Sequence, residues 1–156
     1  MMNENVISLL NDLIQLDIDA VHAYAQAIDN VEESVVRSRL LEFQSDHERH
    51  IRELSEVVLE QGGKPIEHKR DFKGFLIEGM TAIRSSTGTK GALKAMKTNE
   101  VLTNRQYDKA LDEDLPPRVR DLVLRNRDDE RRHLQYIDSC INSRIADTVR
   151  DVHSHM

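Results

Sequence analysis

Tryptophan is absent from this 156-residue chain, and glycine, proline and aromatic residues are scarce: there are six Gly, three Pro and 4% aromatic residues. A β-sandwich or β-barrel needs many tight turns, which are rich in glycine and proline. The scarcity of turn residues therefore disfavours both classes and favours long helices. The length suits one domain with its own core. We expect that domain to span residues 1–150, followed by a flexible tail over 151–156.

Cysteine and long apolar runs are also nearly missing. The one cysteine, Cys140, cannot form an internal disulfide and fits a reducing compartment, so we expect a cytoplasmic protein. No apolar run reaches the roughly 18 residues of a membrane span, and the N-terminus lacks the basic segment of a signal peptide. The net charge is -6, and the basic residues are interleaved with acidic ones. We therefore expect neither a nucleic acid nor a membrane surface as a partner.

Apolar residues recur at steps of three and four along most of the chain, which is the period of an amphipathic helix. These stripes predict helices over residues 5–30, 35–60, 90–112 and about 117–146. The turns between the first two and between the last two are short, so each pair forms an antiparallel hairpin. The connection over 62–89 is long enough to cross the bundle and to contain a short helix over 72–83. The prediction is an all-α, antiparallel four-helix bundle of two hairpins joined by one long crossover.

Three sequence signals mark the expected helix ends. Ser34 is a plausible N-cap for the second helix. The pair Gly62-Gly63 is typical of a helix C-terminus. Pro117 suits the first turn of the last helix.

The two predicted hairpins match each other without a gap at an offset of 83 residues. The match falls on residues that can bind metal, and in both halves the spacing is thirty residues and then three. Asp17, His47 and His50 in the first half align with Glu100, Glu130 and His133 in the second. Tyr24 with Tyr107, Asp46 with Asp129 and Arg49 with Arg132 also coincide.

Helix geometry brings these six residues to one level. Asp17 lies about 16 residues before the first turn and His47 about 14 residues after it, roughly 24 Å and 21 Å along their helices. Glu100 and Glu130 lie about 15 residues from the second turn.

A single histidine on an apolar stripe is more often a hydrogen-bonded core residue, and a single carboxylate can belong to a buried ion pair. Three carboxylates buried together repel one another, however, and a divalent cation removes that penalty. We therefore predict a metal site.

The chain resembles the ferritin-like superfamily of diiron carboxylate proteins over residues 5–146. In that superfamily two helices each give one carboxylate and the other two each give a Glu-x-x-His motif. Glu130-Arg131-Arg132-His133 is this motif, and Asp17 and Glu100 match the single carboxylates. The stretches LLNDLIQLDIDAVHAY, KTNEVLTNRQYDKAL and DDERRHLQYI look more narrowly like a bacterial ferritin-like family of uncharacterised function.

The second motif departs from the superfamily. It reads His47-Glu48-Arg49-His50, so a histidine stands where a glutamate normally bridges two ions. Glu48 points about 100° away from His47 around the helix and is expected to face solvent. The site then has three carboxylates rather than four. It can hold two ions bridged by Glu130, or a single ion.

The resemblance also implies partners for the ligands. Asp129 would orient His50, and Asp46 would orient His133, as an Asp before the Glu-x-x-His glutamate does in the superfamily. The alternative is that these Asp residues pair with arginines at the surface. Tyr24 and Tyr107 lie two turns beyond the single carboxylates on the same faces. They either pack in the core with a hydrogen-bonded hydroxyl or take part in electron transfer.

Two functions follow as expectations. In the first, iron reacts with dioxygen or peroxide in stress protection, as in rubrerythrin relatives; a rubredoxin-type Cys-x-x-Cys module is missing, so the electron donor would be a separate molecule. In the second, the bundle is structural and is stabilised by a metal such as zinc, which the extra histidine suits; manganese is a further candidate. A hollow iron-storage shell is disfavoured because storage ferritins do not usually carry a histidine in both motifs. We expect a monomer or a small homo-oligomer such as a dimer.

Overall fold

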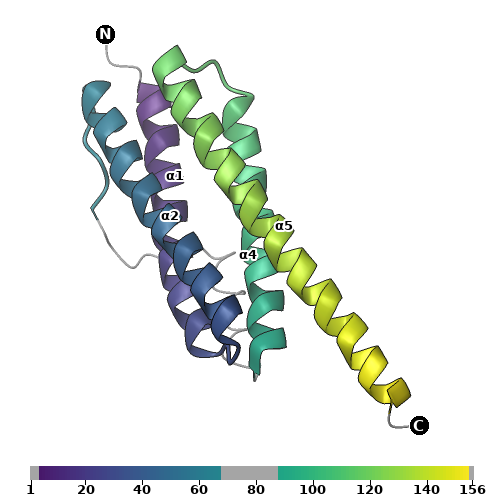
Figure 1. The fold of residues 1–156 in the computed structure, drawn as a ribbon. Helices are drawn as coiled ribbons and strands as arrows, with labels where there is room; N and C mark the ends of the chain where they lie inside the picture. The colour runs from purple at the N-terminus through teal and green to yellow at the C-terminus, as the bar shows by residue number, and fades with distance from the viewer. Residues whose placement is uncertain (1–3, 68–87, 155–156) are drawn as a thin grey trace.

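The computed structural model describes residues 4–67 and 88–154, with side chains described up to Ser143. Its helices are α1 (Glu4–Asp29), α2 (Ser34–Glu60), α4 (Gly88–Leu111) and α5 (Pro117–Ser154) (Figure 1). No strand occurs in the described parts of the chain. The all-α class predicted from the scarcity of turn residues is therefore confirmed. The short helix predicted over 72–83 lies outside the described residues.

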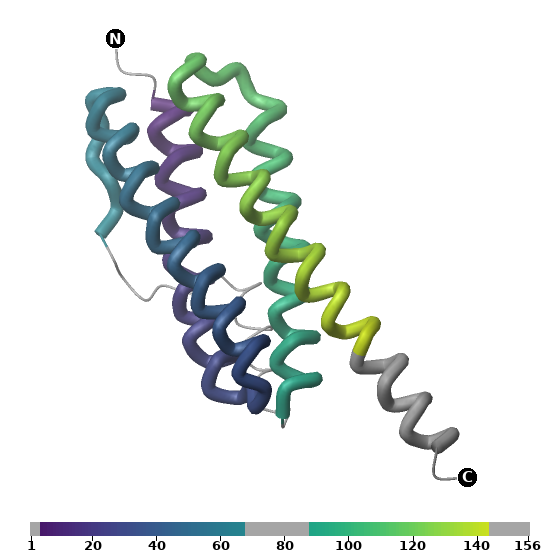
Figure 2. Tube along the Cα trace, viewed as in Figure 1, coloured from purple at the N-terminus to yellow at the C-terminus, as the bar shows by residue number. Residues whose placement is uncertain are grey.

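The helices form two antiparallel hairpins that pack side by side, α1 with α2 and α4 with α5 (Figure 2). Helix α1 also contacts α4, and α2 contacts α5. Helices α2 and α4 run in the same direction, as Figure 1 shows, so the end of α2 and the start of α4 lie at opposite ends of the bundle. The predicted bundle of two hairpins with one crossover is thus confirmed.

The end of α2 has the hydrogen bonds of a Schellman motif, which satisfies the last carbonyls of a helix. The backbone N–H of Gly63 donates to the Val58 carbonyl at 2.9 Å, and that of Gly62 donates to Leu59 at 3.0 Å. Gly62 has a φ of 83°, a conformation that favours glycine. A Cβ on Gly63 would lie 2.7 Å from the Ile7 side chain of α1, so this glycine lets the two helices approach closely.

Two helix ends differ from the sequence prediction. Ser34 is the first residue of α2 rather than its cap; the capping position belongs to Glu33, which makes no side-chain cap hydrogen bond. Instead the Glu33 carboxylate accepts a hydrogen bond from the Thr89 hydroxyl at 2.5 Å, which ties the α1–α2 turn to the start of α4. Helix α5 ends at Ser154, eight residues beyond the predicted end at Ala146, because no glycine or proline interrupts this stretch.

The core consists of two apolar clusters separated by a polar layer. The first includes Leu10, Ile14, Leu54 and Val123, and the second includes Leu40, Leu93, Met96 and Ile137. Each fully buried side chain of this size stabilises the fold by about 1.5–3 kcal/mol. The two clusters hold the polar layer between them, away from water.

Among residues 4–67 and 88–154, no helix combines the length and the apolar character that a membrane span requires.

Candidate metal centre

The polar layer contains all six residues that the internal repeat singled out. Their exposed fractions are 0 to 1%, so the layer is buried as completely as the apolar core. One residue comes from α1, two from α2, one from α4 and two from α5, and they are Asp17, His47, His50, Glu100, Glu130 and His133. The structure therefore brings together the whole predicted set at mid-bundle.

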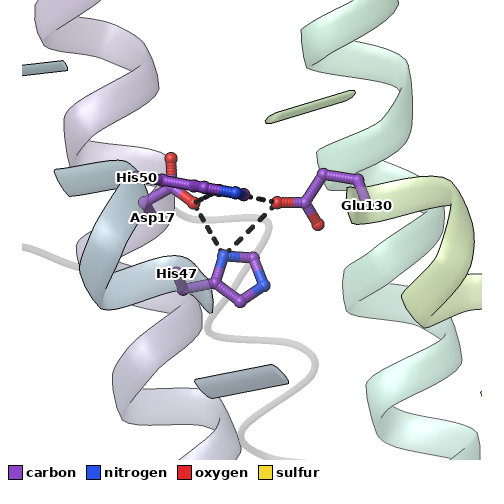
Figure 3. A group of neighbouring side chains, drawn as sticks. All are labelled: Asp17, His47, His50 and Glu130. Atoms are coloured by element: carbon purple, nitrogen blue, oxygen red, sulfur yellow. Dashed lines mark hydrogen bonds and ion pairs between the residues drawn. The ribbon is translucent and has the colours of Figure 1, made fainter. Parts of the chain in front are cut away.

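Four of these residues form a first group, shown in Figure 3, with one ligand atom from each residue within 4.8 Å of the others. The Nδ1 atom of His47 lies 2.6 Å from Asp17 Oδ1, and that of His50 lies 3.1 Å from the same oxygen. Both Nδ1 atoms are 3.4 Å from Glu130 Oε1. A cation at the centre of this group would meet two imidazoles and two carboxylates.

A second group shares two members with the first. It consists of His47, Glu100, Glu130 and His133. Here the other ring nitrogen of His47, Nε2, lies 3.3 Å from Glu100 Oε1, and His133 Nδ1 lies 3.4 Å from the same oxygen. The second carboxylate oxygen of Glu130, Oε2, is 3.7 Å from His133 Nδ1. His47 and Glu130 thus face both groups with different atoms.

The outward nitrogens of the two motif histidines are held by aspartates from the opposite helix. His50 Nε2 is 2.9 Å from Asp129 Oδ2, and His133 Nε2 is 2.8 Å from Asp46 Oδ2. The same aspartates also bond arginines: Arg132 donates to Asp46 at 3.2 Å and to Asp129 at 2.8 Å, and Arg49 donates to Asp129. The two alternatives considered from the sequence, orienting a histidine and pairing with arginine, therefore occur together.

Two buried tyrosines donate to the carboxylates of the opposite hairpin. Tyr24 Oη donates to Glu100 Oε1, and Tyr107 Oη donates to Asp17 Oδ2 at 2.5 Å. Both rings are fully buried. Burial and the nearby carboxylates raise the pKa of both hydroxyls well above the ordinary value of 10.0, so they remain hydrogen-bond donors.

The layer perturbs the pKa of its histidines strongly. Burial by itself lowers the pKa of His47, but the charge of Glu130 and the hydrogen bond to Asp17 outweigh it and raise the pKa to about 9. Burial likewise lowers the pKa of His133, but the bond to Asp46 and the contact with Glu100 raise it to about 11. Without a cation, protons on these rings therefore balance the carboxylates at neutral pH.

The carboxylates respond in the opposite direction. Burial raises the pKa of Glu100, but the contacts with His133 and His47 outweigh it and hold the pKa well below 4.5. The pKa of Asp17 is also lowered, against burial, by His50 and His47. The charged form is thus favoured for both, as a cation ligand requires.

Two buried atoms in the layer show that a cation fits it. Glu130 Oε1 and His133 Nδ1 have no hydrogen-bond partner among the described residues. Buried polar atoms are rarely left without a partner. Both atoms belong to the groups described above, and carboxylate oxygen and imidazole nitrogen are common metal ligands. The residues present therefore fit a divalent cation.

Two further polar residues of the layer were not predicted as part of the site. The Thr103 hydroxyl lies 3.0 Å from Glu100 Oε2 and 3.1 Å from Glu130 Oε2. Asn126 is 2% exposed, and its side-chain amide donates to Tyr107 Oη at 3.4 Å. Both residues lie on the predicted buried stripes of their helices, and that position was the signal the sequence offered.

Two other candidate ligands, Cys140 and His22, belong to neither ligand group. Cys140 is half-buried, and its thiol belongs to neither ligand group. His22 is half-buried and is likewise outside both groups. His68, His153 and His155 lie outside the residues whose side chains are described.

Comparison with known proteins agrees with this architecture. The family described as "Domain of unknown function (DUF2383)" matches residues 5–113, a segment that contains Asp17, His47, His50 and Glu100. Comparison with curated proteins gives no significant match. A solved structure described as "ferritin like, diiron-carboxylate proteins from Bacillus anthracis str. Ames" superposes with a TM-score of 0.68 at 19% sequence identity, covering 88% of this chain and 96% of that chain. The chain is thus a ferritin-like four-helix bundle and belongs to the DUF2383 family.

Proposed function

We propose that the central layer binds one or two divalent cations, with iron as the first candidate. The observation that carries this proposal is the pair of overlapping, fully buried ligand groups that share His47 and Glu130. Three carboxylates buried side by side are costly unless positive charge balances them. A cation supplies that charge and leaves the imidazoles neutral as ligands.

The donor set suits several first-row metals, because imidazole with carboxylate accommodates iron, manganese and zinc. The similarity of the fold to a protein described as diiron-carboxylate supports iron. Both carboxylate oxygens of Glu130 face the centre, Oε1 toward the first group and Oε2 toward the second. If two ions are bound, Glu130 would therefore contact both of them.

We further propose an oxidoreductase-type role in which iron reacts with dioxygen or peroxide in protection against oxidative stress in the cytoplasm. Bound iron would supply the one-electron chemistry. The chain itself holds the ligands: Tyr24 and Tyr107 fix the single carboxylates, and Asp46 and Asp129 fix the outward faces of two histidines. Electrons would come from a separate donor, and we expect the protein to act as a monomer or a homodimer.

The test is anaerobic titration of metal-free protein with ferrous iron, followed by dioxygen or hydrogen peroxide. We expect saturable binding and then a near-ultraviolet absorption band of protein-bound ferric iron. The double variant His50→Ala/His133→Ala should lose both. A wild-type protein that binds no ferrous iron, or binds it without any oxidation, contradicts the oxidoreductase role.

The presence of His47 supports a second function, a metal-stabilised structural bundle without turnover. A third imidazole in place of a carboxylate suits zinc as well as iron. In this case zinc should raise the melting temperature strongly, and ferrous iron in the protein should not react with peroxide. Iron found in protein isolated from cells would count against this alternative.

A further inference from the structure

A polar pocket of about 340 Å³ lies beside the metal centre between α2 and α5. Its walls carry both signs of charge and consist of Arg49, Glu53, Arg125, Asp128 and Asp129, with Asn126 as the sixth lining residue. Asn126 is 2% exposed, whereas the Asp128 side chain is 70% exposed. Asn126 therefore marks the inner end of the pocket and Asp128 its mouth.

Two hydrogen-bonded chains lead from this pocket to the first ligand group. The Asn126 amide donates to Tyr107 Oη at 3.4 Å, and Tyr107 Oη donates to Asp17 Oδ2 at 2.5 Å. On the wall, Asp129 contacts His50 Nε2 at 2.9 Å. Both chains end on ligands of the first group, the group shown in Figure 3. The pocket thus adjoins the Asp17 and His50 side of the centre.

The internal repeat shows what occupies the equivalent place on the other side. At the offset of 83 residues, Asn126 corresponds to Phe43 and Glu53 corresponds to Tyr136. Phe43 stacks on His133 with ring centroids 4.2 Å apart, and Tyr136 packs edge-on against Phe43 at 5.5 Å. The Arg39 guanidinium covers both rings, at 5.6 Å and 5.0 Å from their centroids. Aromatic rings therefore fill the position that the pocket opens on the first side.

The two halves of the repeat carry the same aspartate and arginine residues. They differ in the side chain beside the motif histidine, which is Asn126 on the His50 side and Phe43 on the His133 side. A polar molecule passing Asn126 finds a donor and an acceptor on the amide, whereas one passing Phe43 loses its hydrogen bonds without replacement. The charges on the pocket wall are largely paired, since Arg49 and Arg125 both contact Glu53, at 3.3 Å and 3.5 Å. The paired wall charges therefore leave no strong field at the pocket, which suits small polar molecules that are neutral or carry a single charge.

We propose that small polar molecules of the size of water or hydrogen peroxide reach the metal centre through this pocket, and that Asn126 determines this one-sided access. The inference rests on the proposed metal centre and adds which side of it meets an external molecule. Asn126 acts here as a specificity-determining residue, not as a ligand. The Glu100 and His133 side is closed by Phe43 and Tyr136.

The first test uses cobalt as the metal and azide as the external molecule. Cobalt-loaded wild-type protein should change its visible absorption when azide is added. Asn126→Phe, which installs the residue of the equivalent position, should bind cobalt normally but lose the response to azide. Asn126→Leu has a side chain close to asparagine in size and should lose it as well, which guards against a folding defect in the larger variant.

Phe43→Leu is the matched control, because it changes the equivalent buried position without adding a polar group. It should keep the wild-type azide response. A wild-type response in both Asn126 variants would overturn the inference. So would a loss of the response in Phe43→Leu as severe as in Asn126→Phe.

The second test needs no metal. In chelated protein labelled with 3-fluorotyrosine and transferred from H₂O to D₂O, the fluorine resonance of Tyr107 should take up its isotope shift faster than that of Tyr24. Tyr24→Phe and Tyr136→Phe variants assign the three resonances, and Asn126→Leu should slow the exchange at Tyr107. Equal exchange rates for Tyr107 and Tyr24 would overturn the inference. Failure of cobalt to bind would instead refute the metal centre, while the Tyr107 resonance would still decide the access route.

Discussion

His47 is the residue that most distinguishes this centre, because its two ring nitrogens face different carboxylates. Nδ1 is 2.6 Å from Asp17 and Nε2 is 3.3 Å from Glu100. In the superfamily that this chain resembles, a glutamate occupies the position. The histidine leaves three carboxylates in the layer, and it makes His47 a member of both ligand groups.

Alanine variants of the histidines should separate the shared ligand from the unshared ones. His47→Ala should lower the affinity for every ion that the wild type binds, because both ligand groups lose a donor atom. His50→Ala should weaken binding in the first group and His133→Ala in the second, since each belongs to one group. Equilibrium dialysis with elemental analysis measures this.

Glu48→Gln is the control for these variants, because Glu48 follows His47 directly in the chain but its side chain is exposed to solvent. It should bind metal as the wild type does. Unchanged binding by His47→Ala would show that this residue is not a ligand and would remove the shared position from the centre.

The aspartates behind the histidines should tune affinity without touching the ion. Asp129→Asn and Asp46→Asn each replace a charged acceptor of an imidazole N–H, and loss of such support typically costs about 10–100-fold in metal affinity. Competition with a chelator of known affinity gives the number. Asp128→Asn removes a neighbouring but 70% exposed charge and should have little effect. Equal losses in Asp128→Asn and Asp129→Asn would mean that only overall charge matters.

At the scale of the elements, the packing of α1 against α2 depends on how α2 ends. Gly62 has φ of 83° and lies in the Schellman motif that closes the helix. Gly62→Ala forces a Cβ into this conformation and should lower the free energy of unfolding by about 1 kcal/mol. Urea denaturation of metal-free protein measures the change. Ser45→Ala, at an exposed position within α2, should be nearly neutral; a neutral Gly62→Ala would contradict the assigned role.

The elements could be predicted because their signals are local. Hydrophobic periodicity specified four helices, and Gly62-Gly63 and Pro117 marked two of their ends correctly. The Ser34 cap was wrong because a contact distant in sequence decided the end: Thr89 bonds both the Glu32 N–H, at 2.9 Å, and the Glu33 carboxylate. The predicted end of α5 was too early, although no glycine or proline follows Ala146 and apolar residues still recur there, at Val149 and Val152.

The convergence of six ionisable side chains in the middle of the molecule could be predicted because the repeat aligned them at one level. Thr103 and Asn126 were not predicted, since a small polar residue on a buried stripe has no distinctive spacing. Their roles come from contacts between helices, such as Thr103 between Glu100 and Glu130. The pocket at Asn126 could not be predicted from the sequence either, because part of its wall comes from the facing helix α2.

The buried charges should make the stability of the metal-free bundle depend on pH. The pKa of His47 is about 9 and that of His133 about 11 in the folded protein, against an ordinary value of 6.5. Folding therefore gains the full contribution of their protons below about pH 6.5. The contribution decreases as pH rises and is lost above about 9 for His47 and about 11 for His133.

Chemical denaturation of chelated protein should show this decline as a loss of a few kcal/mol between pH 6.5 and 9. Saturating zinc should offset it, because the cation replaces the protons and binds more tightly as they leave. A flat profile in the chelated protein would contradict the assigned pairing of imidazolium and carboxylate. A similar decline with and without zinc would contradict metal binding at these rings.

The central claim is that this layer exists to hold a cation, and anomalous diffraction tests it most directly. Crystals of protein purified without chelator, soaked anaerobically in ferrous iron, should show an anomalous peak within bonding distance of Glu130 and at least one of His50 and His133. The peak should disappear in His50→Ala/His133→Ala crystals. An anomalous map without a peak in the layer at saturating iron, with the six side chains bonded only to one another and to water, would contradict the claim.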